Sequence, residues 1–200
     1  MLVNKQLTME KPAFTRGYLP HWDGRLVFVT FRLADSLPVS ALQEMKAFDM
    51  LWQFKWEQGE LTEEWAEDFR RKRAAFENEL LDKALGSCVL KRDNVRALLS
   101  EVLLHFNGVR YYMHTFVIMP NHVHMVLQPF EGWRIQDIMH SIKSYSAKVI
   151  NQLLGRKGEF WQREYYDRYI RNERHYYAVM RYIEGNPRHC APDEFTLYKG

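Results

Sequence analysis

The sequence contains no long run of apolar residues. No stretch approaches the ~18 consecutive apolar residues that a membrane-spanning helix requires, which argues against an integral membrane protein. Residues 1–10 mix polar and charged side chains among the apolar ones, unlike the start of a signal peptide. We therefore expect a cytoplasmic protein that makes no contact with a membrane.

Cysteine is also scarce. Only Cys88 and Cys190 occur, and neither belongs to a Cys-x-x-Cys pair. A redox motif or a cysteine-based zinc site is therefore not indicated, and we expect two reduced thiols, as is usual in the cytoplasm.

The net charge is only +3, but the two signs are separated along the chain. Residues 143–188 carry ten Lys and Arg against five Asp and Glu, whereas residues 57–86 carry nine acidic and five basic side chains. Tyrosines and a tryptophan are interleaved with the basic residues of the first segment. This composition suits a nucleic-acid backbone with unpaired bases. A solvated basic face over core aromatics fits the composition equally well.

The 200 residues, 46% of them hydrophobic, suffice for one well-packed domain. Strand patterns occur at 25–33, 111–119, 122–128 and 165–170, and helical patterns occur at 40–56, 62–84, 94–106, 135–154 and 173–185. If the helical pair within about 40–86 is an insertion, the remaining order is β-α-β-β-α-β followed by an extra helix. We predict a single α+β domain over 1–200, built on a ferredoxin-like antiparallel sheet.

His122 and His124 stand one residue apart at the start of the third predicted strand. Side chains alternate between the two faces of a strand, so both imidazoles should point to one side and Val123 and Met125 to the other. Two imidazoles side by side on a rigid sheet predict a metal site.

Tyr182 and Asn186 are four residues apart on the last predicted helix and therefore share one of its faces. If that face packs over His122 and His124, the Asn186 amide oxygen becomes a third ligand and the Tyr182 phenol lies near the metal. Two imidazoles and one amide oxygen suit Mn²⁺ or Mg²⁺. A tyrosine oxygen beside such a cation is a candidate nucleophile toward a phosphodiester. Asn186, which precedes Pro187, can alternatively end the helix, since a residue before proline is disfavoured in the helical region.

These motifs resemble those of the single-tyrosine HUH transposases, and in particular the REP-associated tyrosine transposases of bacteria. The resemblance covers most of residues 16–190. It rests on Met-Pro-Asn-His-Val-His at 119–124, on Tyr-Ile-x-x-Asn-Pro at 182–187, and on the segments 19–22, 29–38 and 158–167.

The resemblance implies that His122, His124 and Asn186 bind a Mg²⁺ or Mn²⁺ ion and that Tyr182 is the catalytic nucleophile. The implied activity is cleavage and rejoining of single-stranded DNA beside REP-type palindromic hairpins through a 5′-phosphotyrosine intermediate. It places the protein in the bacterial cytoplasm, associated with the nucleoid, as a monomer or a homodimer. Six basic residues are candidate phosphate contacts, although each also fits an ordinary surface charge: Lys143, Lys148, Arg163, Arg168, Arg171 and Arg174.

Two other functions remain open from the sequence. A domesticated relative could bind hairpin DNA without cutting it, although the intact set of four site residues argues against this. A histidine-triad-like nucleotide hydrolase would need a third alternating histidine, and Val126 stands at that position.

Overall fold

The computed structural model describes residues 26–60 and 62–200. Segment 19–22 and the first residue of the predicted strand 25–33 lie outside the described residues. No helix in the described part of the chain is long and apolar enough to cross a membrane.

The centre of the molecule is a five-stranded sheet in the order β4-β1-β3-β2-β5, with every pairing antiparallel. The strands are β1 (Val27–Arg32), β2 (Tyr111–Ile118), β3 (His122–Pro129), β4 (Tyr166–Tyr169) and β5 (Thr196–Lys199). The first four strands have the ferredoxin-like order, which confirms the predicted fold class. The strands and helices predicted between residues 25 and 185 are all found, with bounds that differ by a few residues.

The fifth strand is not among the predicted elements. β5 has four residues and pairs along β2, where Thr115 lies opposite Lys199 and Ile118 opposite Thr196. So short a strand has little stability of its own, and the hydrogen bonds that define it come from a partner about 80 residues away.

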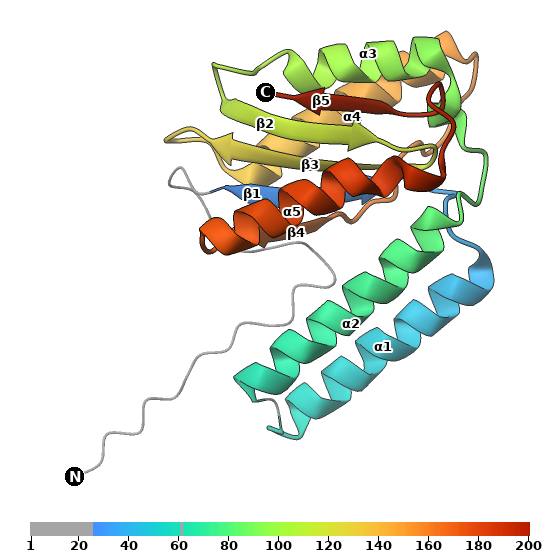
Figure 1. Cartoon of the computed structure of the whole chain (residues 1–200). Coiled ribbons are helices and arrows are strands. Elements are labelled where there is room, and N and C mark those ends of the chain that lie inside the picture. The colour runs from blue at the N-terminus through green and yellow to red at the C-terminus, as the bar shows by residue number, and fades with distance from the viewer. Residues whose placement is uncertain (1–25, 61) are drawn as a thin grey trace.

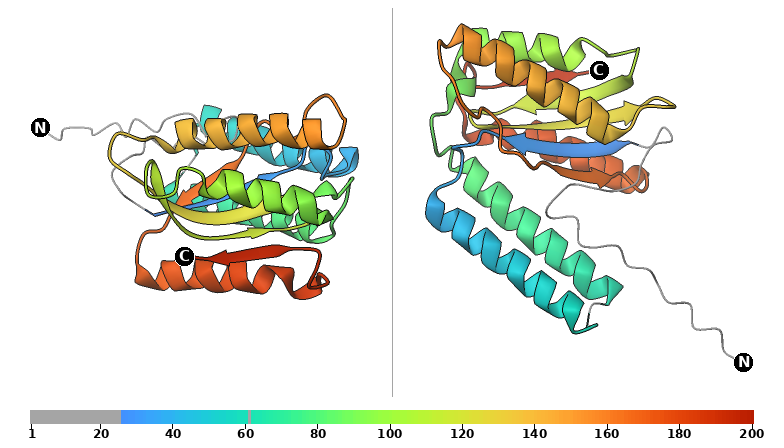
Figure 2. Two further views of the ribbon diagram at one scale, coloured as in Figure 1. Left: turned by 90° about the horizontal axis from the view of Figure 1, so that it is seen from above. Right: turned by 180° about the vertical axis from the view of Figure 1, so that it is seen from behind.

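Helices cover both faces of the sheet (Figures 1 and 2). α3 (Asp93–Leu104) and α4 (Ile135–Leu153) lie on one face, and α5 (Glu173–Gly185) lies on the other. A large buried cluster of aliphatic and aromatic residues joins α3 and α4 to the sheet, whereas a smaller one, around Val126 and Ile183, packs under α5. Along β3 the side chains of Val123, Met125 and Leu127 belong to the large cluster, so this alternating set faces α3 and α4.

A helical hairpin, α1 (Val39–Glu57) and α2 (Glu63–Asp82), is inserted between β1 and α3 and projects from the β4 side of the sheet (Figure 1). The Thr62 hydroxyl caps α2 by accepting from the Trp65 amide. Trp52 and Phe69 pack between the two helices, so the hairpin has a small aromatic core of its own.

An ion pair ties this hairpin to the sheet. The Arg32 guanidinium, at the end of β1, donates to Glu77 on α2 at 2.9 Å, and both side chains are largely buried. Arg32 also donates to the Ser36 hydroxyl at 3.2 Å. α2 is therefore attached to the end of β1, and β1 pairs with β3, the strand that carries both histidines.

Candidate metal and tyrosine site

The two histidines of β3 face α5 and are completely buried. Their Nε2 atoms are 3.0 Å apart. Two such nitrogens attract each other only if a proton or a cation lies between them. Val123 packs on the opposite face of the sheet, so the predicted alternation of side chains at 122–124 is confirmed.

Asn121 fixes the tautomer of His122. Its Nδ2 donates to the Leu85 carbonyl at 3.1 Å, which leaves Asn121 Oδ1 facing His122 Nδ1 at 2.7 Å. An amide oxygen only accepts, so Nδ1 carries the proton and Nε2 keeps a free lone pair. The free Nε2 is the one that faces His124.

His124 is held in place by β1. The Thr30 hydroxyl lies 2.7 Å from His124 Nδ1, and the Phe28 ring stacks on the imidazole with the ring centroids 5.7 Å apart. Burial lowers the pKa of His122 to about 3 and the pKa of His124 well below its usual range, the neighbouring His122 adding to the second effect. Both imidazoles are thus neutral at physiological pH, the form that binds metals.

Tyr182 reaches the histidines from α5. Its hydroxyl oxygen is 3.2 Å from His124 Nε2, and its ring packs edge-on against Phe28. Burial raises the pKa of Tyr182, and the nearby Asp82 carboxylate acts in the same direction. The phenol is therefore protonated in the free protein and needs additional positive charge to become a nucleophile.

Asn186 lies one turn beyond Tyr182. Its Oδ1 is buried and has no hydrogen-bond partner among the described residues. Its side chain lies close enough to His122 to oppose the effect of burial on the pKa of that histidine. A buried amide oxygen without a partner is costly, and a bound cation would remove that cost.

The alternative prediction, that Asn186 ends the helix, is confirmed in that α5 ends at Gly185 with Asn186 as its C-cap residue, but the reason given for it, departure from the helical region before Pro187, is wrong. Asn186 has φ −61° and ψ −43°, and the chain continues into a 3₁₀ helix, η2 (Asn186–His189). Proline is tolerated there because it occupies the first turn of this new helix, where its missing N–H costs nothing. The continued helix keeps Asn186 on the same side as Tyr182.

These donors fit a hexacoordinate divalent cation. Ligands about 2.1 Å from such an ion and at right angles to each other are about 3.0 Å apart, which matches the separation of the two Nε2 atoms. No group of three or more His, Cys, Asp or Glu side chains suitable for a metal occurs within 26–60 and 62–200. The amide oxygen of Asn186, which is buried and unpartnered and whose side chain interacts with His122, is the candidate for a third ligand.

The six predicted phosphate contacts lie in different surroundings. Lys143 is half-buried, donates to the carbonyls of Gln162 and Arg163, and has a pKa lowered by burial to about 8. Lys148 is exposed on α4, which lies on the face opposite α5. Arg163 and Arg174 are exposed, whereas Arg168 and Arg171 both donate to Glu67 of α2. Burial and hydrogen-bond partners therefore differ among these six residues, and their role in DNA binding stays a prediction.

Two residues of the site, Thr30 and Asn121, were not singled out from the sequence. Thr30 is the one hydroxyl in the apolar run 26–31, and Asn121 directly precedes His122. Both are polar residues that the fold buries. A buried polar residue indicates a hydrogen-bonding role, but the sequence reveals it only if the burial of that position is predicted first.

Comparison with known proteins agrees with this geometry. Residues 88–186, which include His122, His124, Tyr182 and Asn186, match the family described as IS200-like transposases. This part of the chain matches that family, and the resemblance drawn from the sequence is confirmed at this level. The match begins after the α1–α2 hairpin.

Two solved structures are similar to the chain. One is a REP-associated tyrosine transposase bound to a REP hairpin, at 16% identity and a TM-score of 0.47, covering 86% of this chain and 73% of that one. The other is a candidate transposase from Deinococcus radiodurans R1, at 15% identity and a TM-score of 0.37, covering 84% and 95%. Among curated proteins, none matches this chain.

Proposed function

We propose that this protein is a metal-dependent single-stranded DNA endonuclease and strand transferase that cuts and rejoins DNA beside hairpins of the REP type. The observation that carries the proposal is the convergence of the Tyr182 hydroxyl with two neutral imidazoles, 3.2 Å from one of them, beside an unpartnered amide oxygen. The transposase family of residues 88–186 supports the same reaction class. Hairpin DNA is the partner of one structurally similar protein.

His122, His124 and Asn186 would hold a Mg²⁺ or Mn²⁺ ion. When bound, the ion supplies positive charge that polarises the scissile phosphate and favours the phenolate of Tyr182. Asn121 and Thr30 orient the two imidazoles, so that little motion is needed to form the site.

The Tyr182 oxygen attacks the phosphorus in line with the bond to the 3′ oxygen. The phenol gives up its proton to solvent, the new bond joins the tyrosine oxygen to the phosphorus, the P–O3′ bond breaks, and the 3′ oxygen leaves and takes up a proton. The product is a 5′-phosphotyrosine ester and a free 3′-OH. Attack of a 3′-OH on this ester reverses the step, so rejoining needs no nucleotide cofactor.

Trapping the ester tests the proposal. A hairpin oligonucleotide with single-stranded flanks, labelled at its 3′ end, should give a denaturation-resistant protein–DNA adduct with Mn²⁺ or Mg²⁺ and none with a chelator. Tyr182→Phe should abolish the adduct. The matched control, Tyr177→Phe, changes an exposed tyrosine of the same helix and should retain it.

A non-catalytic hairpin-binding protein is the competing function. It would bind the same oligonucleotide with an affinity independent of metal and would form no adduct with any divalent cation. That result would refute the endonuclease proposal.

A further inference from the structure

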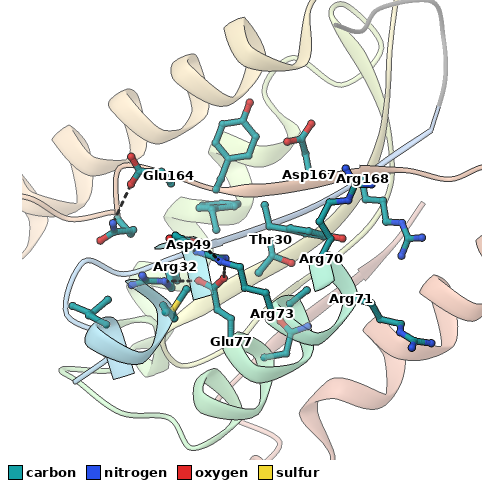
Figure 3. A pocket seen from close by; sticks show the side chains of 18 of the residues that line it. Thr30, Arg32, Asp49, Arg70, Arg71, Arg73, Glu77, Glu164, Asp167 and Arg168 are labelled. Atoms are coloured by element: carbon teal, nitrogen blue, oxygen red, sulfur yellow. Dashed lines mark hydrogen bonds and ion pairs between the residues drawn. The ribbon is translucent and has the colours of Figure 1, made fainter. Parts of the chain in front are cut away.

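A pocket of about 630 Å³ lies between the α1–α2 hairpin and the β1 and β4 strands, and we call it the hairpin groove (Figure 3). Its lining contains seven basic and five acidic side chains. Two of the acidic residues, Asp49 and Glu77, are engaged by Arg73 and Arg32. In Figure 3 these four residues form one network, and Arg70, Arg71 and Arg168 lie toward the other end.

Two arginines of this groove converge on a single oxygen. Arg168 and Arg171 donate to the same Oε1 atom of Glu67, at 3.2 and 3.0 Å. Arg168 belongs to β4 and Arg171 follows it, whereas Glu67 belongs to the inserted α2. Two guanidinium groups directed at one anionic oxygen have the arrangement that binds a phosphate.

This contact is weak enough to be exchanged. The Arg171 side chain is 61% exposed and the Glu67 side chain 45%, and ion pairs this exposed contribute little to stability. A DNA phosphate offers the same charge with more acceptor oxygens. Replacement of the Glu67 carboxylate by a phosphate would therefore cost the fold little.

Further cations in the groove are available to contact neighbouring phosphates of the same DNA strand. Lys46 on α1 and Arg70 on α2 are exposed and form no ion pair among the residues that the structure describes. The Arg70 guanidinium lies 5.7 Å from the centre of the Trp52 ring. The wall formed by the inserted hairpin thus offers two exposed cations to an anionic strand.

The hairpin groove also borders the side chains that cover the tyrosine site. Thr30 lines the groove and contacts His124 at 2.7 Å. Tyr166, which lies opposite Thr30 in the sheet, packs against Phe28, and Phe28 contacts the Tyr182 ring. Thr30 and Tyr166 line the groove, whereas His124 and Tyr182 do not, so one layer of side chains separates the groove from the residues proposed to cut DNA.

We propose that the hairpin groove binds the backbone of an unpaired DNA strand next to the scissile bond, and that Glu67 occupies the place of a phosphate in the free protein. The α1–α2 insertion then serves as the outer wall of a substrate channel. A pocket of this volume accommodates a drug-sized molecule, about one or two nucleotides, so it suits one strand and not a duplex. The inference rests on the proposed function.

Two substitutions of opposite sign test the proposal. Fluorescence anisotropy should measure the affinity of the full chain for a labelled, unstructured oligonucleotide, in chelator and at several salt concentrations. Arg171→Gln should weaken binding at least fivefold and lower the slope of log affinity against log salt by about 0.7. Glu67→Gln should strengthen binding at least twofold, because it removes the competing carboxylate.

Lys157→Gln is the matched control, since it removes one exposed charge outside the groove and should change affinity less than twofold. If the ion pair only attaches the α1–α2 hairpin to the sheet, Arg171→Gln and Glu67→Gln will have the same effect on DNA affinity. Both variants would then weaken binding or both would leave it unchanged, and either result would show that the inference is wrong. Should Arg171→Gln fail to fold, Arg70→Gln gives the same test, with weaker binding expected and unchanged binding refuting the proposal.

The adduct assay separates this inference from the proposed function. If the wild type forms no adduct while the groove variants shift affinity in opposite directions, the endonuclease proposal fails and the groove stands as a single-strand binding site. If the adduct forms normally and the groove variants bind DNA like the wild type, the groove proposal fails alone.

Discussion

Asn121 offers the sharpest test of how the site is built. Asn121→Ala removes the hydrogen bond to the Leu85 carbonyl and the one to His122 Nδ1. The hydrogen bond to the Leu85 carbonyl is only partly buried, so water can replace it. His122 is fully buried, and an unpaired N–H there costs about 1–3 kcal/mol. We expect the free energy of unfolding, measured by urea denaturation without metal, to fall by about 2 kcal/mol.

The same substitution should weaken divalent cation binding by about 10–100-fold, because His122 is no longer held in the tautomer that leaves Nε2 free. Titration with Mn²⁺ measures this effect. Asn121→Asp keeps an acceptor for Nδ1 and should recover most of the affinity without restoring the bond to Leu85. Gln152→Ala, an exposed change on α4, should alter neither quantity. Wild-type stability and Mn²⁺ affinity in Asn121→Ala would refute the assigned tautomer.

Three further predictions follow from buried charge and from the site. Burial raises the pKa of Asp167 from 3.8 to about 7, while Arg168 and Tyr166 are its charged or titratable neighbours on β4. The folded state therefore loses up to about 4 kcal/mol of stability as pH rises from about 4 to 7. In denaturation curves, Asp167→Asn should be more stable than the wild type at pH 8 and as stable as the wild type at pH 4. Glu77→Leu leaves the Arg32 guanidinium buried and unpaired and should cost about 3 kcal/mol by urea denaturation, whereas an unchanged midpoint would show that Arg32 is solvated. Mn²⁺ should raise the melting temperature of the wild type but not of His124→Ala, and an equal rise in both would place the ion elsewhere.

The order of elements was predictable because each carries a local signal. The alternating pattern around His122 identified β3 and the side to which both imidazoles point. The i, i+4 spacing likewise placed Tyr182 and Asn186 on one face of α5. These patterns depend only on backbone geometry, which is the same in every protein.

β5, by contrast, consists of four residues whose hydrogen-bond partners all lie on β2, so no local pattern distinguishes it from a loop. The helical state of Asn186 before Pro187 also departs from the local rule, because η2 continues α5.

What the sequence determined by itself was the kind of chemistry: two histidines on one strand face, and a tyrosine and an asparagine on one helix face. Only the tertiary structure decided that these faces meet, that the Leu85 carbonyl orients Asn121 and Thr30 holds His124, and that the inserted hairpin brings Glu67 against Arg168 and Arg171. The reason is that such contacts join segments up to about a hundred residues apart. Their energies come from burial and charge at the place where the segments pack, and no periodicity within one segment encodes them.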